Sequence, residues 1–364
     1  MIPQGPAGWT LALASVENFI LINTVLSIIG FGVAAGLRAS KLSIAWHPRE
    51  RARLYAATLI IPPVMSAWLV CASLLPAMWL GNGRWQQEHE PAHTLHLLNA
   101  FTISLDPTLG YATLIFTTLA ALVAIYASLS AYFRIGRVIQ QLEIGAAPAE
   151  AEQIRNVAET CRKHGIAVGL VASNYPFSFV WGYLDSKLVV STGLLNALSK
   201  DELACVLEHE TAHHTRRDNL AKLALVIGRY LSPAFPLTHL LYRWWSEQVE
   251  MICDEIAVRH TQAPVELAGA LVRLKRLTLY AAPPKIQPAA SGLFGDDKDN
   301  FERRVKHVLS LADRVDHPAA GGLSRSCVRI ALTLGATFAL SLAALFAVSP
   351  LAIHKVVETI LHVF

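Results

Sequence analysis

The stretch ELACVLEHETAHHTRRDNL, residues 202–220, decides the expected fold of this 364-residue chain. Just before it, Ser199 stands three residues ahead of Glu202, which is the capping-box signature of a helix start. The pattern predicts a helix from Ser199 to about Arg216. The chemistry suggested by the stretch therefore belongs on a helix, where residues three or four apart share a face.

Residues 209–213 read HETAH, an H-E-x-x-H pattern in the middle of this predicted helix. His209 and His213 lie four residues apart, so both imidazoles can reach one metal ion, with Glu210 beside it. The expected cofactor is one Zn²⁺ ion per chain. Glu210 is the expected catalytic base, which takes a proton from water activated by the metal and later passes it to the leaving amine. The predicted reaction is peptide hydrolysis.

A catalytic zinc ion needs three protein ligands and one open position. Further along, Glu250 and Asp254 stand four residues apart and would share a helix face. We expect Glu250 to be the third ligand and Asp254 to accept the outer N–H of one histidine. Asp218 is an alternative ligand, but on a continuous helix it would lie about 140° from His213. The other alternative is that Glu250 and Asp254 are solvated helix charges.

The chain is strongly apolar, with 53% hydrophobic residues, 16% charged residues and a mean hydropathy of +0.40. Long apolar runs of about 20 residues, as membrane helices need, occupy residues 10–36, 54–80, 111–133 and 330–349 approximately. The net charge is only +4, and basic residues flank these runs instead of forming one patch. Direct nucleic-acid binding is therefore not expected.

Basic residues concentrate in the loop 37–53, which places this loop in the cytosol, whereas the acidic loop 81–110 is expected outside. The expected division is a three-helix transmembrane region over 1–133, a cytosolic zinc metalloprotease domain over 134–329, and a last membrane helix with a short outer tail over 330–364. Both termini are then outside. The expected fold class is a mainly α membrane protein of about four transmembrane helices with a cytosolic α+β zincin-like domain that has a small β-sheet.

Within that domain, SFVWGYLDSKLVVS, residues 178–191, is rich in aromatic and β-branched residues around a candidate turn at 183–186 and predicts a β-hairpin. The apolar stretch 220–245 is interrupted by charged residues and prolines, so it fits a buried or membrane-facing hairpin better than a membrane helix.

The wider pattern resembles the BlaR/MecR-type membrane metallopeptidases, the antirepressor family of bacterial β-lactam sensing. Residues 202–220 and the run YRWWSEQVEMICDEIAV, residues 242–258, carry the resemblance. It implies His209, His213 and Glu250 as zinc ligands and Glu210 as the base. It also implies a multi-pass protein of the bacterial inner membrane that cleaves a cytosolic regulator, such as a transcriptional repressor, or a membrane-proximal protein. A homo-oligomeric state is left open.

The sensors of that family continue past the last membrane helix into an extracellular penicillin-binding domain, which residues 350–364 do not provide. Direct β-lactam sensing is therefore not expected. In gluzincin-type sites of this kind the substrate commonly adds as a strand to the edge of a small sheet. The candidate substrate contacts there are Ser178, Phe179, Val180, Trp181 and Gly182. The alternative is that they form an ordinary core strand.

Two rival interpretations stay open. The CAAX-prenyl-protease and HtpX-like membrane quality-control proteases share H-E-x-x-H and a later Glu-x-x-x-Asp, and residues 301–305, FERRV, partly match their Glu-Arg-Ile. On this match Arg304 is a candidate substrate contact, or else a solvated charge. The second rival is a membrane signalling protein with a latent or structural zinc site, in which Cys205 or Cys253 would be the fourth ligand.

Overall fold

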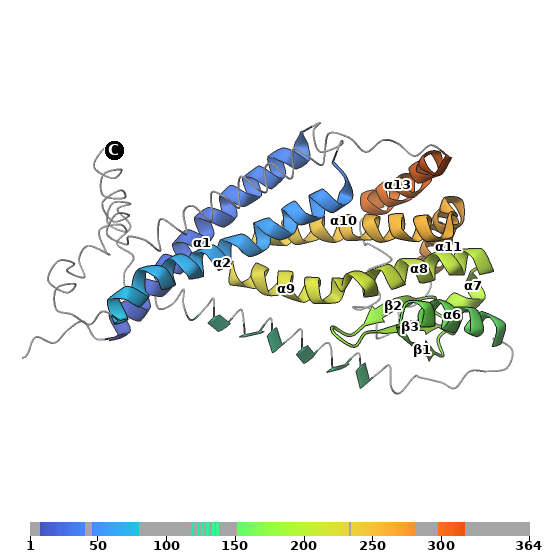
Figure 1. The fold of residues 1–364 in the computed structure, drawn as a ribbon, viewed down its shortest axis with the longest axis horizontal. Helices are drawn as coiled ribbons and strands as arrows, with labels where there is room; N and C mark the ends of the chain where they lie inside the picture. The colour runs from blue at the N-terminus through green and yellow to red at the C-terminus, as the bar shows by residue number, and fades with distance from the viewer. Residues whose placement is uncertain are drawn as a thin grey trace, which may run out of the picture.

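The computed structural model describes residues 8–40, 46–79, 151–232, 234–280 and 298–316, together with short pieces between residues 115 and 137. These residues form a mostly helical molecule with one small mixed sheet (Figure 1). At that level the expected fold class is confirmed.

The helices are α1 (Gly8–Ala39), α2 (Pro48–Trp79), α6 (Ala151–Lys163), α7 (Thr192–Ala197), α8 (Lys200–Arg216), α9 (Asp218–Leu231), α10 (Phe235–Thr261), α11 (Pro264–Tyr280) and α13 (Lys298–Asp316). The strands are β1 (Ala167–Val171), β2 (Ser178–Trp181) and β3 (Lys187–Ser191).

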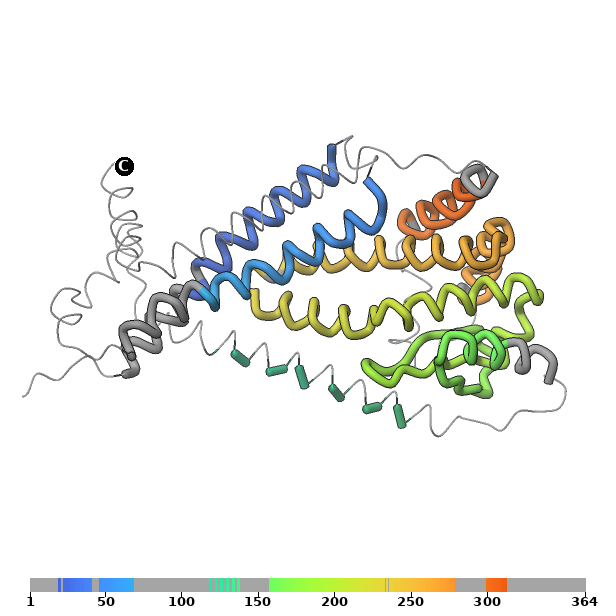
Figure 2. Tube along the Cα trace, in the orientation of Figure 1, coloured from blue at the N-terminus to red at the C-terminus, as the bar shows by residue number. Residues whose placement is uncertain are grey.

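Helices α1, α2 and α10 run side by side as long rods (Figure 2). Their shared core is apolar and includes Tyr55 and Leu59 of α2 with Leu241 and Trp245 of α10. Polar groups of the apolar run 10–36 face the turn between α9 and α10, where Asn23 Nδ2 donates to the Leu231 carbonyl at 2.8 Å. A polar group on an apolar helix is thereby paired within the protein.

One helix of the described part of the chain is long and apolar enough to cross a membrane, and its qualifying stretch is Ile22–Ala39 of α1. The run 54–80 falls almost entirely within α2. Only pieces of the run 111–133 are described. The outer loop 81–110 and the region 330–364 lie outside the described residues, so the expected arrangement of four membrane helices stays a prediction.

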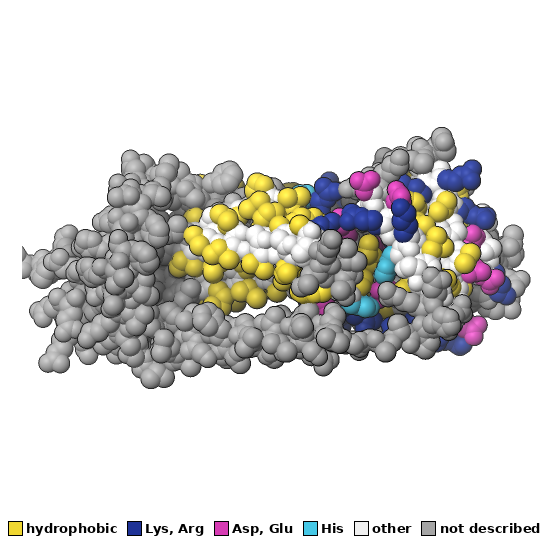
Figure 3. All heavy atoms as spheres, turned by 90° about the horizontal axis from the view of Figure 1, so that it is seen from above, with side chains coloured by type: hydrophobic (Ala, Val, Ile, Leu, Met, Phe, Trp, Pro, Cys, Tyr) yellow, Lys and Arg dark blue, Asp and Glu magenta, His cyan; other side chains and the backbone are white. Residues whose placement is uncertain are grey.

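The outer surface of α1 and α2 is apolar in the way that a lipid-facing surface would be. Exposed side chains there include Ile28, Ile29 and Val33 of α1 and Ile61 and Val64 of α2. Figure 3 shows hydrophobic side chains gathered over part of one face, next to a region rich in charged side chains. This distribution agrees with a protein that has one part in a membrane and one part in water.

The sheet has the strand order β1-β3-β2. β1 and β3 are parallel, and β2 pairs antiparallel with β3, with Ser178 opposite Val190. β2 and β3 are the two strands predicted within residues 178–191. Among the described residues β2 pairs only with β3, which makes it an edge strand of the sheet and leaves one side of its backbone facing away from the sheet.

Helix α8 begins with the predicted capping box. The Glu202 amide donates to Ser199 Oγ at 3.3 Å, and the Ser199 amide donates to a Glu202 carboxylate oxygen at 2.9 Å. The helix ends at Arg217, which adopts a left-handed conformation with φ 55°. α9 starts at the next residue, and α9 and α10 together form the helical hairpin that occupies the stretch 220–245.

Candidate metal and catalytic site

Helices α8 and α10 pack against each other and bring two histidines and a carboxylate together. His209 Nε2 lies 3.4 Å from one oxygen of Glu250, and His213 Nε2 lies 3.6 Å from the other. All three side chains are buried. The ligand atoms of the three residues lie within 4.8 Å of one another, close enough to hold a single ion.

The outer nitrogen of each histidine has a carboxylate of its own. His209 Nδ1 lies 2.8 Å from an oxygen of Asp254, and His213 Nδ1 lies 2.8 Å from an oxygen of Asp218. Each carboxylate can accept an N–H from its imidazole, and in the neutral form of the ring the Nε2 lone pair would then be directed toward an ion beside Glu250. Such outer partners fix the tautomer and orientation of a metal-binding histidine.

The position of Asp218 depends on how α8 ends. The helical-phase argument assumed that the helix continues past His213, but the left-handed residue Arg217 ends α8 and redirects the chain. Asp218 then starts α9 and turns back toward the outer nitrogen of His213. Sequence reasoning missed this role, although the charged run of residues 216–218 just after the motif is a signal of a helix end.

Arg304 of α13 lies at the back of the site. Its guanidinium donates to both oxygens of Asp254, at 2.6 and 2.8 Å, and its Nη1 lies 3.2 Å from Glu250. The side chain is only 4% exposed, so the alternative that Arg304 is a solvated charge is wrong. Glu250 and Asp254 are buried too, at 6% and 0%, and they are not solvated helix charges either.

These contacts set the charges of the site. Burial opposes ionisation of Glu250, but the positive charges of His213 and Arg304 outweigh burial and hold the pKa of Glu250 well below its usual range. Burial likewise opposes ionisation of Asp254, yet Arg304 and His209 bring its pKa to about 2. Both carboxylates are therefore ionised at neutral pH, as a metal ligand and its supporting group need to be.

The arrangement fits a zinc ion on a further ground. Both carboxylate oxygens of Glu250 are buried and lack a hydrogen bond of good geometry, and the guanidinium of Arg304 lies 3.2 Å from one of them. A buried carboxylate is costly unless it is paired, and a metal ion between Glu250 and the two imidazoles would add a second positive partner. Two imidazoles and one carboxylate are the donor set that a catalytic zinc site uses, with a position left for water.

Neither candidate thiol joins this group of donor atoms. Cys205 Sγ contacts Thr261 Oγ1 at 3.5 Å and the Ala263 carbonyl at 3.6 Å, away from the histidines. Cys253 Sγ lies 3.4 Å from His213 Nδ1, the outer nitrogen, and forms a separate group of close donor atoms with His213 and Asp218. Neither thiol therefore belongs to the group formed by His209, His213 and Glu250.

Glu210, the residue expected to be the base, lies between this group and the sheet. Its side chain is buried, and one carboxylate oxygen accepts a hydrogen bond from Ser178 Oγ at 3.0 Å. Ser178 is the first residue of β2, so the edge strand begins directly beside the carboxylate of Glu210.

The other candidate substrate residues divide into two sets. Phe179 packs into an apolar cluster with Phe177 and Val189, and Trp181 packs partly against that cluster. Val180 and Gly182 direct their carbonyls away from β3, because Asn219 Nδ2 donates to both, at 2.8 and 3.0 Å. Asn219 was not anticipated from the sequence. Its bonds occupy the carbonyls at one end of the strand, whereas Ser178 at the other end bonds to Glu210.

Comparisons with known proteins agree with a peptidase of this general kind. A family model described as BlaR1 peptidase M56 matches residues 102–308. A shorter similarity links the chain to Protease HtpX of Acinetobacter baylyi, which is 39% identical over 85 residues, covering 22% of this chain and 28% of that protein. Protease HtpX of Acinetobacter baumannii is 38% identical over the same length, so the chain matches little more than a quarter of these relatives.

Proposed function

The chain belongs to the BlaR1 peptidase M56 family, and on this premise we propose that it is a zinc-dependent endopeptidase of the bacterial inner membrane. Its proposed ligands are His209, His213 and Glu250, and Glu210 is the proposed base. The proposed substrate is a cytosolic regulator, such as a transcriptional repressor, or a protein segment close to the membrane.

One observation carries the proposal: two imidazoles turn their Nε2 atoms to one buried carboxylate, and the three donor groups lie close enough together to share a single ion. Asp254 and Asp218 hold the opposite ring nitrogens, and Arg304 holds Asp254. Prearranged donors of this kind cost little reorganisation when an ion binds. A purely structural packing of α8 on α10 would not need a separate carboxylate for each histidine.

When bound, a zinc ion supplies Lewis-acid activation of water and of the scissile carbonyl group. The residues of the chain do the rest. Glu210 accepts the proton of the attacking water and returns it to the leaving nitrogen, and the Ser178 hydroxyl keeps its carboxylate oriented between the two events. Asp254 and Asp218 stabilise the positive charge that builds up on the two imidazoles.

The edge of β2 is the proposed docking place for the substrate backbone. An extended peptide that pairs with the outer side of Ser178 and Val180 would lie next to Glu210. Because Asn219 occupies the carbonyls of Val180 and Gly182, the paired segment is short. Selectivity would then depend on a few residues around the cleaved bond.

An HtpX-like role in membrane protein quality control is the second candidate. It is supported by the 85-residue similarity to Protease HtpX and by the apolar surface of α1 and α2. The two roles differ in substrate: a regulator-cleaving protease cuts one folded partner at one position, whereas a quality-control protease cuts many unfolded membrane proteins.

The test is cleavage by the purified full chain in detergent, with a candidate repressor and an unfolded membrane protein as the two substrates. Glu210→Gln is expected to lower the cleavage rate about 10²–10⁴-fold while the bound zinc is retained. Glu302→Gln, a change of an exposed glutamate on α13, is the matched control and should cleave normally. Equal cleavage by wild type and Glu210→Gln would remove the proposal.

A further inference from the structure

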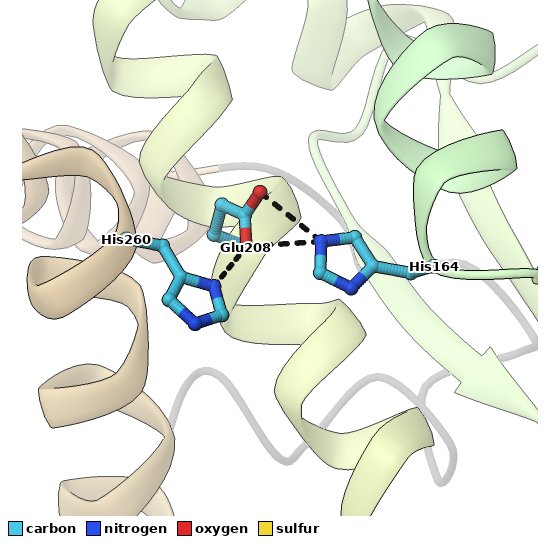
Figure 4. A group of neighbouring side chains, drawn as sticks. All are labelled: His164, Glu208 and His260. Atoms are coloured by element: carbon cyan, nitrogen blue, oxygen red, sulfur yellow. Dashed lines mark hydrogen bonds and ion pairs between the residues drawn. The ribbon is translucent and has the colours of Figure 1, made fainter.

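A second group of metal-binding side chains lies on another face of α8. Figure 4 shows His164, from the turn after α6, and His260, from the last turn of α10, on either side of Glu208 of α8. His164 Nε2 lies 3.2 Å from both oxygens of Glu208, and His260 Nδ1 lies 2.7 Å from one of them. Three separate elements thus meet at one carboxylate.

The donor atoms of this group are as close together as those of the candidate catalytic site. All lie within 4.8 Å of one another, and the two imidazole rings are nearly parallel, with centroids 6.0 Å apart and an angle of 13° between their planes. Two imidazoles and one carboxylate again form a donor set that suits Zn²⁺ and related transition ions more than Ca²⁺ or Mg²⁺, which prefer oxygen ligands.

The three side chains differ in exposure in a way that suits an accessible site. The side chains of Glu208 and His164 are 10% and 16% exposed, whereas that of His260 is 42% exposed. An ion could therefore enter from solvent and keep water on its open side. Although Glu208 precedes His209 in the chain, it lies about 100° round the helix, so its carboxylate faces away from the candidate catalytic group.

The backbone holds His164 in place. Gly165 adopts φ 67°, a left-handed conformation that favours glycine, and the Ile166 amide donates to the Cys161 carbonyl at 3.0 Å. This closure of α6 fixes where His164 stands as the chain enters β1. The imidazole is therefore positioned by the fold and not by its contact with Glu208 alone.

Another glutamate between two histidines offers a comparison within the same molecule. Glu255 contacts His47 through one oxygen, at 3.0 Å, and His307 through the other, at 3.1 Å. The donor atoms of these three residues are not among the described groups that lie within 4.8 Å of one another. Glu255 thus pairs with two rings through its two separate oxygens, whereas around Glu208 one ligand atom of each of the three residues lies within 4.8 Å of the other two.

We infer that His164, Glu208 and His260 bind a second divalent transition-metal ion, of the Zn²⁺ class, distinct from the ion of the H-E-x-x-H site. The bound ion ties the end of α6, and with it the start of the sheet, to the α8–α10 pair. Its role is to brace the surface next to the catalytic helix, because an ion shared by three elements stabilises only the state in which they are docked.

The test counts zinc bound to the full chain in detergent after dialysis against buffered Zn²⁺. The wild type should hold two equivalents, and His164→Ala, His260→Ala and Glu208→Gln should each hold one. The matched controls His47→Ala and His307→Ala should keep both. Added Zn²⁺ should also raise the melting temperature of His209→Ala, which keeps the second site, but not that of the double variant His209→Ala/His260→Ala.

Two equivalents retained by both His164→Ala and His260→Ala would overturn the inference, as would a wild type that binds a single equivalent and loses it in His209→Ala. The second result would leave the proposed protease site intact. Conversely, equal cleavage by wild type and Glu210→Gln, with two zinc equivalents bound to both, would count against the proposed function alone, so the two proposals can fail separately.

Discussion

At the scale of single residues, each histidine of the candidate catalytic site contacts a carboxylate through its outer ring nitrogen: His209 contacts Asp254, and His213 contacts Asp218. Asp254 is held further by Arg304, and Asp218 by Arg216 Nε at 3.2 Å. Burial opposes ionisation of Asp218, but His213 and Arg216 outweigh burial and lower its pKa. The imidazoles therefore act as parts of charged networks and not as isolated ligands.

Replacing Asp218 tests this arrangement at a residue whose role sequence reasoning missed. Asp218→Asn keeps an oxygen near His213 Nδ1 but removes its charge, so zinc affinity should fall about 10–100-fold. Competition with a chromophoric chelator measures the zinc affinity. Both chains also carry His260→Ala, which removes the second proposed metal site, so that only the H-E-x-x-H site is measured. Asp185→Asn, on the exposed hairpin tip, is the control. Unchanged affinity in Asp218→Asn would mean that its carboxylate does not support the metal site.

At the scale of elements, the edge of β2 is where the sheet meets α8. Ser178 at the start of this strand bonds to Glu210, and Asn219 at the start of α9 closes the far end of the strand. Among the described residues, the unpaired part of the edge is therefore bounded on one side by Glu210 and on the other by α9.

Val180→Pro tests whether substrate pairs with this edge. Proline removes the Val180 N–H, which faces away from β3, and proline is tolerated at such edge positions. Loss of one backbone hydrogen bond, worth about 1 kcal/mol, should lower kcat/KM roughly 5–10-fold without loss of zinc. Val180→Ala keeps the N–H and should remain close to wild type. If both variants cleave equally well, the substrate does not pair with Val180.

Glu255 of α10 forms ion pairs with His47 in the loop 37–53 and with His307 of α13, and so links these three segments. Burial opposes ionisation of Glu255, but hydrogen bonds from His307 and His47 outweigh burial and lower its pKa from 4.5 to about 2. A carboxyl with a lowered pKa contributes stability that is present above its unfolded-state value and is lost as pH falls toward its folded-state value.

The expected loss at Glu255 therefore lies between about pH 5 and pH 2 and amounts to about 3 kcal/mol at most. Melting temperature against pH should fall more steeply through this window in wild type than in Glu255→Gln. The exposed-site variant Glu302→Gln should follow wild type. Parallel curves for wild type and Glu255→Gln would show that the ion pairs of Glu255 contribute no pH-dependent stability.

At the scale of the whole molecule, the apolar helices and the charged part that holds the candidate site form one continuous structure. α10 takes part in both, since its first half packs with α1 and α2 and its second half carries Glu250, Asp254 and His260. A displacement of the apolar helices would therefore be passed to the candidate site along α10 itself.

The proposed orientation puts this catalytic part in the cytosol. Leu184, at the exposed hairpin tip with 74% exposure, marks that side. Leu184→Cys should react with an impermeant maleimide only after the membrane is opened, whereas Asn82→Cys, in the predicted outer loop, should react in intact spheroplasts. The unsubstituted chain gives the background. Labelling of Leu184→Cys in intact spheroplasts would contradict the proposed topology.

Local patterns of the sequence were sufficient for several elements. The capping box and the i, i+4 spacing predicted α8 and the shared face of His209 and His213, because helix geometry is set by neighbours within one or two turns. β-branched and aromatic residues likewise predicted the strands of 178–191. The same i, i+4 spacing on a second helix predicted that Glu250 and Asp254 share a face.

Other features were decided only by tertiary structure. The turn at Arg217 brought Asp218 to His213, the docking of α13 buried Arg304 on Asp254, and the meeting of α6, α8 and α10 gathered His164, Glu208 and His260. Each of these contacts joins separate elements, and periodicity along a helix or strand says nothing about which elements meet. The sequence by itself determined which side chains lie on the same face of each helix or strand. The packing of the elements decided which of these side chains come together in one site.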